Sequence, residues 1–354
     1  MNPLIASIAY CYVGCSPGAP DAQALHVLKC DTLTGAIEIV QSIKDIAGTT
    51  YFQFGKNAAA LYTVISEMRN GKKESSLVKF PVDGYRLGAM CRLSDLPCEA
   101  PCHVGISPDG AQIAFAAYLS ASIGVAPAAG GDCVMKVLPD VGMGCDPERQ
   151  KKAYAHFAFY TPDAQKIGFI DLGCDKIHFF EAATMKSVPE MFIKADSGDG
   201  PRHAVWSKDG RYLFVLNELS STVASYAFDG KSFSRVCKLS MLPADFDGWS
   251  KASAIKLTAD GGVLMAGNRG HDSIALYRVS ADGKLTLANI AKLEGRYPRD
   301  FELMPGEKFM VVGHKMSNEI QVYRFDREAC TLTPCGKPVE AFKPLCFKFR
   351  ENPR

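Results

Sequence analysis

The chain has 354 residues, 47% of them hydrophobic, and its 40 basic residues nearly balance its 38 acidic ones. This balance leaves no footprint of a nucleic-acid or other polyanionic partner, so any basic feature must be local. The first apolar run covers only positions 4 to 13. It is too short to span a membrane, and no basic segment precedes it as in a signal peptide.

The 13 cysteines are an odd number and are scattered along the chain without a compact framework. This pattern is typical of reduced thiols in the cytoplasm, where disulfides are rare. No cysteine pair is followed by histidines at the spacing of a zinc site. We therefore expect a cytoplasmic protein without a metal or another cofactor, whose oligomeric state the sequence does not indicate.

Along the chain a unit recurs in which a turn lies between two short apolar runs with polar residues at their outer ends. A weak first copy runs from Thr50 past Asn57 to Glu67. The later copies are Pro101 to Tyr118, His156 to Asp171, Pro201 to Glu218, Ser253 to Arg269, and Arg299 to His314 and Lys315. Each copy reads as an antiparallel hairpin.

The copy around Asp209-Gly210 is the clearest, because glycine accepts the positive φ that a tight hairpin turn requires. Arg202 lies eight residues before Gly210, and Glu218 lies eight residues after it. The two ends of a hairpin meet, so this cation and this carboxylate should face each other.

The turns fall at positions 57, 109, 163, 209, 260 and 306, which is a period of 46 to 54 residues. Such a period with short strands is typical of β-propeller blades. Second hairpins at Asp83-Gly84, Asp229-Gly230 and Asp282-Gly283 predict four strands in each blade.

The six turns account for six blades, and the two ends of the chain supply a seventh. Lys343 to Phe349 reads as an innermost strand, and Ile5 to Val13, Leu25 to Cys30 and Ala36 to Gln41 would complete its sheet. Such closure leaves no exposed sheet edge. The prediction is an all-β, seven-bladed β-propeller with four antiparallel strands per blade, forming a single domain over residues 1–354.

In the predicted ring every first turn lies at one face. The starts of the first strands and the ends of the second strands therefore share the opposite face. A ring of cations around one carboxylate at that face should attract a small anion. The loop from Asp140 to Lys152, with Arg149 and Gln150, is expected to cover the mouth. The polar residues collected at this face are His156, Arg202, Glu218, Arg269, Arg299, His314 and Lys315.

Individual residues keep alternative interpretations. Arg202 and Glu218 could form an ion pair that only ties two strands together. His156 faces Asp171 across its hairpin, and a carboxylate that orients an imidazole suits acid or base chemistry. His103 and His203 lie one residue further along their strands than the positions that we expect to face the channel, such as Arg202. Successive side chains of a strand alternate, so we expect the two histidines to point into the packing between blades.

Several segments, in this order, resemble the seven-bladed-propeller lactonase family, which includes one type of 6-phosphogluconolactonase and the fungal carboxy-cis,cis-muconate cyclising enzyme. The chain departs from the family pattern at Tyr154, at Ala254 and at Gly313-His314. The segments that carry the resemblance are Gly142 to Gln150, Tyr154 to His156, Asp171 to Asp175, Gly200 to His203, Asn217 to Leu219, Asn268 to Gly270 and Pro298 to Phe301.

The resemblance implies a hydrolase that opens a sugar lactone, 6-phosphogluconolactone first, as in the pentose phosphate pathway. Its partner would be a small anionic substrate, a phosphorylated sugar lactone or a carboxylate, with no nucleic acid and no membrane. A lactone-forming cyclase of the carboxymuconate type and a metabolite-binding propeller without activity remain alternatives. The resemblance implies catalytic roles for His156, Arg202, Glu218 and Arg269, and substrate contacts for Arg149, Gln150, Asp171, Arg299, His314 and Lys315.

Overall fold

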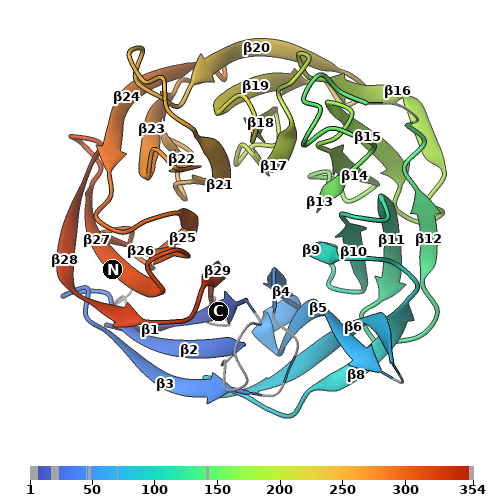
Figure 1. Ribbon diagram of the computed structural model, residues 1–354, viewed down its shortest axis with the longest axis horizontal. Helices are drawn as coiled ribbons and strands as arrows, with labels where there is room; N and C mark the ends of the chain where they lie inside the picture. Colours follow the sequence, from blue (N-terminus) through green and yellow to red (C-terminus); the bar gives the residue numbers. More distant parts are fainter. Residues whose placement is uncertain are drawn as a thin grey trace.

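The computed structural model describes residues 7–16, 24–44, 46, 49–69, 71–140 and 143–350. Seven antiparallel sheets stand around a central channel as the blades of a ring (Figure 1). Six sheets have four strands, and the remaining one carries a short fifth strand. The predicted seven-bladed propeller is therefore confirmed. The described residues include no helix that is long and apolar enough to cross a membrane.

Each blade contributes its innermost strand to the channel wall (Figure 1). These strands are β4 (Phe52–Phe54), β9 (Pro101–Ile106), β13 (Ala155–Tyr160), β17 (Pro201–Trp206), β21 (Lys251–Leu257), β25 (Pro298–Leu303) and β29 (Pro344–Phe349). The second strands are β5 (Ala60–Arg69), β10 (Gln112–Ala117), β14 (Lys166–Asp171), β18 (Tyr212–Asn217), β22 (Val263–Arg269), β26 (Phe309–His314) and β1 (Ile8–Cys15).

The third and fourth strands form the outer part of each blade. The third strands are β6 (Lys72–Asp83), β11 (Ser122–Pro127), β15 (Lys176–Glu181), β19 (Thr222–Phe228), β23 (Ser273–Val279), β27 (Glu319–Asp326) and β2 (Leu25–Asp31). The outermost are β8 (Cys91–Leu96), β12 (Val134–Val137), β16 (Ser187–Lys194), β20 (Phe233–Ser240), β24 (Leu285–Lys292), β28 (Thr331–Glu340) and β3 (Ile37–Ile43). A short strand β7 (Arg86–Leu87) pairs with β6, and one 3-10 turn, η1 (Lys56–Ala58), lies between β4 and β5.

The ring closes where the two ends of the chain meet in one sheet. Strand β29 pairs with β1 in antiparallel register, with Val13 opposite Phe347. Both side chains are buried, in one apolar cluster with Phe309 of the preceding blade. The predicted closure is thus confirmed, although Ile5, where the first strand was expected to begin, lies outside the described residues.

The turns between first and second strands share one hydrogen-bond pattern. In four blades a serine or threonine hydroxyl donates to an aspartate two residues later, as from Ser207 to Asp209 (2.7 Å) and from Thr161 to Asp163 (2.6 Å). The residue after the aspartate has a positive φ, 71° at Gly210 but also 58° at Ala164. Ala164 therefore occupies a conformation that disfavours a side chain.

Replacing Ala164 with glycine should stabilise the fold. Relief of the left-handed strain outweighs the extra freedom of the unfolded chain, so the free energy of unfolding should rise by roughly 0.5 to 1 kcal/mol. Urea unfolding of the variant checks this result. Ala281, which has no positive φ, is the control, because glycine there should lower stability. A lower midpoint for Ala164→Gly would contradict the assignment of strain.

Candidate functional site

The centre of the site is Glu218, which is buried directly after β18. Its Oε2 lies 2.8 Å from Nε of Arg202 and 3.0 Å from Nη2 of Arg269. Its Oε1 lies 2.7 Å from Nη2 of Arg149. Burial alone would raise the pKa of Glu218, but Arg269, Arg202 and Arg149 together hold it well below its usual range. The carboxylate is therefore ionised and engaged on both oxygens.

Bulges at the start of four inner strands turn one side chain of each strand into the channel. In β17 the register passes from Pro201 to His203 and omits Arg202. The same irregularity omits Cys102 in β9, His156 in β13 and Arg299 in β25. A bulge breaks the alternation of a strand and re-aims the extra side chain. Two consecutive residues can then face the same side.

This geometry extends the expectation for His103 and His203. Both rings pack against Phe157 of the blade between theirs, as predicted, and both also line a cavity in the channel. Nη1 of Arg202 lies 2.5 Å from Nε2 of His203. A guanidinium can only donate, so this nitrogen accepts and His203 is neutral. Burial and then Arg202 lower the pKa of His203 well below the usual range.

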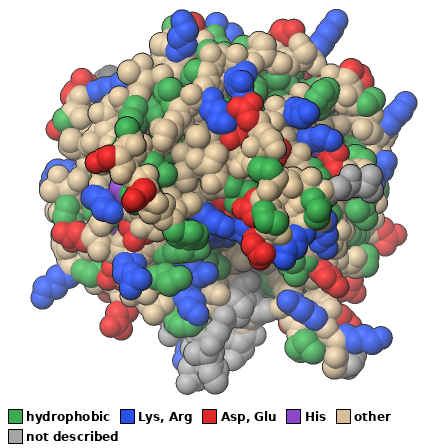
Figure 2. Space-filling view, turned by 45° about the horizontal axis from the view of Figure 1, so that its top comes forward, with side chains coloured by type: hydrophobic (Ala, Val, Ile, Leu, Met, Phe, Trp, Pro, Cys, Tyr) green, Lys and Arg blue, Asp and Glu red, His purple; other side chains and the backbone are tan. Residues whose placement is uncertain are grey.

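Arg299 adds a further cation to a site that already has more arginines than carboxylates. The structure shows no carboxylate within 4 Å of its guanidinium among the described residues, in contrast to Arg149, Arg202 and Arg269. Burial and the nearby Arg269 lower the pKa of Arg299, whereas Glu218 raises it. Four guanidinium groups therefore surround one carboxylate, an arrangement suited to binding an anion. Figure 2 shows basic side chains near the hollow in the middle of one face of the ring.

His156 is buried beside the arginines. Burial first, and then Arg202, lower the pKa of His156 well below 6.5, so the imidazole is neutral at pH 7. Its Nδ1 has no hydrogen-bond partner among the described residues. The ring lies 5.4 Å from that of His203 and 5.7 Å from that of Tyr118. A neutral imidazole with a free nitrogen can accept a proton.

Asp171 does not orient His156 as the sequence suggested. Its Oδ1 accepts the backbone N–H groups of Tyr154 (2.8 Å), Gly173 (2.9 Å) and Cys174 (3.2 Å). The carboxylate thus caps the turn after β14. The bulge at His156 explains the error, because Asp171 pairs with Ala155 and not with the histidine.

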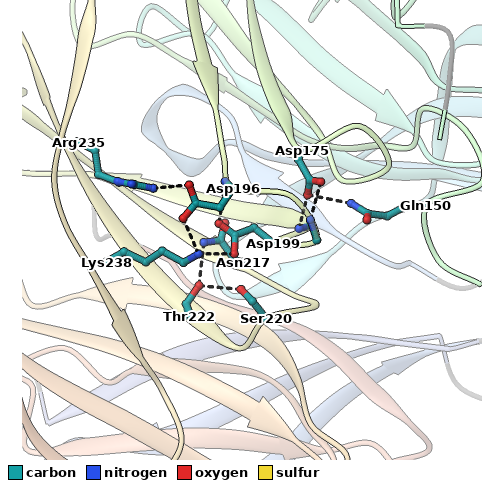
Figure 3. A network of polar contacts seen from close by, with 11 residues as sticks. Gln150, Asp175, Asp196, Asp199, Asn217, Ser220, Thr222, Arg235 and Lys238 are labelled. Carbon is teal, nitrogen blue, oxygen red and sulfur yellow. Dashed lines mark hydrogen bonds and ion pairs between the residues drawn. The ribbon is translucent and has the colours of Figure 1, made fainter. Parts of the chain in front are cut away.

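Gln150 is also structural, in contrast to its predicted contact with substrate. It is fully buried, and its Nε2 donates to Leu172 O (3.0 Å) and to Asp175 Oδ1 (2.8 Å). Asp175 also accepts the N–H groups of Gly198 and Gly200 just before β17 (Figure 3). The network therefore fixes the loop that carries Arg149 to the segment that leads into Arg202.

The loop that was expected to cover the mouth reaches the site through Arg149. Arg149 projects from the loop to Glu218, and its Nη2 also donates to the Tyr118 hydroxyl over 3.3 Å. Residues 141 and 142, including Gly142 of the motif, lie outside the described residues.

The two residues expected at the end of β26 separate in the structure. His314 is fully buried, and its Nε2 lies 3.3 Å from the hydroxyl of Tyr323, away from the arginines. Lys315 faces the site, because its Nζ lies 5.6 Å from the Tyr297 ring, over which Arg269 also lies. Burial and then Arg299 lower the pKa of Lys315.

Aromatic residues at the mouth were not predicted as part of the site. Tyr118 stacks on Tyr154 with ring centroids 4.6 Å apart, and Tyr297 lies beside Arg269 and Lys315. Tyr118 could have been found, because it ends its repeat at the position where Glu218 ends another. Tyr297 lies between strands and carries no such signal.

Asp140, Asp171 and His178 place ligand atoms within 4.8 Å of one another, which a metal ion would require. Both oxygens of Asp140 already have partners, since Lys176 Nζ and His178 Nε2 each lie 2.5 Å away. The contacts of Asp140 with Lys176 and His178 anchor the start of the loop. No disulfide joins any two of the thirteen cysteines, all of which the structure describes.

Comparison with known proteins identifies relatives over almost the whole chain. The family described as "Lactonase, 7-bladed beta-propeller" matches residues 10–349. A 6-phosphogluconolactonase of Bacillus subtilis (strain 168) is 28% identical over 336 residues, which cover 93% of this chain and 95% of that protein.

Two solved structures are similar across the whole ring. A protein from Lactobacillus plantarum has a TM-score of 0.88 and 28% identity, over 97% of this chain and 100% of that one. The periplasmic gluconolactonase PpgL of Pseudomonas aeruginosa has a TM-score of 0.85 and 25% identity, over 97% of this chain and 99% of its own.

Proposed function

The chain belongs to the seven-bladed β-propeller lactonase family, and from that premise we propose that it hydrolyses a small anionic sugar lactone, 6-phosphogluconolactone. The observation that carries the proposal is the set of four guanidinium groups around the single carboxylate of Glu218. The name of the Bacillus subtilis relative supports this choice of substrate. We also infer a cytoplasmic location, which the lack of disulfides among the thirteen cysteines supports.

In the proposed reaction the excess positive charge binds the phosphate. Arg299 suits this role because the described residues place no carboxylate within 4 Å of its guanidinium, and Lys315 adds a second cation at the mouth. Phosphate recognition by arginine uses paired N–H donors and so fixes orientation as well as position. The lactone carbonyl would then lie over Glu218 and His156.

We assign the general base to His156 and not to Glu218. Both oxygens of Glu218 are engaged by arginines, so neither is free to take a proton from water. His156 is neutral and has an unpartnered ring nitrogen. It would take a proton from water as the hydroxide adds to the carbonyl carbon, with a guanidinium stabilising the oxyanion.

The ring C–O bond then breaks and its oxygen takes a proton, which gives a hydroxy acid. This product ionises and releases one proton to the medium. Glu218 would act by holding Arg202 and Arg269 in place, which is a positioning role. Neither group forms a covalent intermediate in this scheme.

The test is enzyme-dependent hydrolysis of 6-phosphogluconolactone, followed by proton release with the spontaneous rate subtracted. His156→Gln should lower kcat by about 10²- to 10⁴-fold, the usual contribution of a general base. Arg299→Leu should mainly raise KM, because it removes a phosphate contact. Arg211→Leu is the matched control, since Arg211 is exposed at the turn face and pairs with Asp209.

Absence of turnover by folded wild-type protein would contradict the proposed substrate. Wild-type kcat in folded His156→Gln would contradict the assigned base. An unchanged KM in Arg299→Leu would contradict the assigned phosphate contact.

A further inference from the structure

Besides the site around Glu218, the channel holds a cavity of about 380 Å³ in the half nearer the hairpin turns. Its wall includes Ile106, Tyr160, Trp206 and Leu257, each the last residue of its inner strand. Arg202, by contrast, is the second residue of its strand. The cavity and the arginine site therefore occupy opposite halves of the channel. We call the former the turn-side cavity.

A layer of tilted rings in contact with one another lies between the two halves. The rings of Tyr51 and His103 are 4.0 Å apart, those of His103 and Phe157 are 3.8 Å apart, and those of Phe157 and His203 are 4.7 Å apart. All four residues line the turn-side cavity. Because His203 also contacts Arg202, this layer separates the arginine site from the turn-side cavity and contacts both.

Two lysines and two carboxylates line the turn-side cavity. Lys256 is paired twice, because its Nζ lies 2.8 Å from Glu302 Oε2 and 3.6 Å from Asp300 Oδ1. Asp300 Oδ2 also accepts the N–H of Phe347. Lys348 is paired much more weakly, with Glu302 Oε2 at 4.0 Å. Its ammonium group therefore retains donors for a ligand.

His103 supplies a second donor. Its Nδ1 accepts the N–H of Ala158 over 3.2 Å. In a neutral imidazole the other nitrogen then carries the hydrogen. This Nε2 is buried and has no hydrogen-bond partner among the described residues, and the side chain is only 2% exposed. A buried donor without an acceptor is costly, and a bound anion would satisfy it.

We propose that the turn-side cavity binds a small monocarboxylate, whose oxygens accept hydrogen bonds from His103 Nε2 and Lys348 Nζ. The two lysines and two carboxylates cancel, so the cavity has no net charge that would favour a polyanion. Glu302 would repel a second negative charge on the ligand, and its carboxylate can accept a hydrogen bond from a hydroxyl group of the ligand. The volume lies at the lower end of the range for small-molecule sites.

This site is separate from the proposed lactonase reaction, and its test does not depend on that activity. The probe is glycolate, which combines one carboxylate with one hydroxyl. The titration uses the Arg299→Leu protein and is monitored by calorimetry. The substitution removes one of the four guanidinium groups and so weakens the arginine site as a competing anion site, and the Lys348 and His103 variants described next distinguish the two sites. We expect saturable binding in that background. Glycolamide, which has the same shape without the charge, should not bind.

Adding Lys348→Met to that background should weaken glycolate binding at least tenfold, and Lys348→Gln provides a second variant if the first does not fold. In ¹⁵N-histidine spectra, glycolate should shift the Nε2–H signal that is lost in His103→Asn. Absence of binding in the Arg299→Leu background, binding unchanged by both lysine variants, or an unshifted His103 signal at saturation would each overturn the proposal.

Discussion

Replacing Glu218 with glutamine is expected to abolish most of the activity and to destabilise the ring. The substitution keeps the shape but removes the single negative charge among four guanidinium groups, which then repel one another. Loss of one partner from a buried ion pair costs about 3 to 5 kcal/mol. Displacement of the arginines should lower kcat/KM by about 10²- to 10³-fold, as for loss of an oxyanion contact.

Urea unfolding and initial rates of 6-phosphogluconolactone hydrolysis measure the two effects separately. Glu340→Gln at the exposed end of β28 is the matched control and should change neither. A destabilised Glu218→Gln protein that retains wild-type kcat/KM per folded molecule would show that Glu218 only ties strands together. That result would contradict the site.

The second large effect is a steep loss of stability in mild acid. Burial lowers the pKa of His103, His156 and His203 well below 6.5, with Arg202 contributing in each case. Below pH 6.5 the unfolded chain therefore binds protons that the folded chain does not. Unfolding takes up protons, so stability falls as the pH decreases, by about 1.4 kcal/mol per histidine per pH unit. The three channel histidines together give about 4 kcal/mol per unit below pH 6.

Urea unfolding at pH 7, 6 and 5 checks this slope. Burial also lowers the pKa of His26 to about 4, and His26 lies outside the channel at a Ser42 contact. His26→Gln should therefore reduce the number of protons taken up on unfolding between pH 6 and 5 by about one, and the slope of stability against pH falls in proportion. This holds whatever the substitution does to stability at pH 7. A free energy of unfolding that is constant from pH 7 to 5 would contradict the neutral state of these buried imidazoles.

The pairing of Arg202 with Glu218 followed from local spacing. A hairpin centred on Gly210 brings its ends together whatever surrounds it, because the turn fixes the register of both strands. The same reasoning failed for His156 and Asp171. Arg202 and His156 both lie at bulges, but Glu218 lies one residue beyond β18, whereas Asp171 is the last residue of β14. Bulges carry no residue pattern that the repeat alone reveals, so the position of His103 and His203 at the channel cavity was not predicted.

Side-chain contacts between residues that are far apart in the chain could not be predicted from the sequence either. Arg149 and Glu218 are 69 positions apart, and Gln150 and Asp175 are 25 positions apart. Adjacent residues of one loop thus have unrelated roles, one in the site and one in the network behind it. Only the path of the loop across neighbouring blades separates the two roles.

The sequence by itself determined the seven-bladed ring, its closure by both chain ends and the face at which the charged residues gather. These features depend on turn chemistry and on strand period, which are local properties of the chain. The tertiary structure alone decided which of those residues meet. Side-chain direction at a bulge and contact between blades depend on how seven sheets pack around one channel, and no single hairpin contains that information.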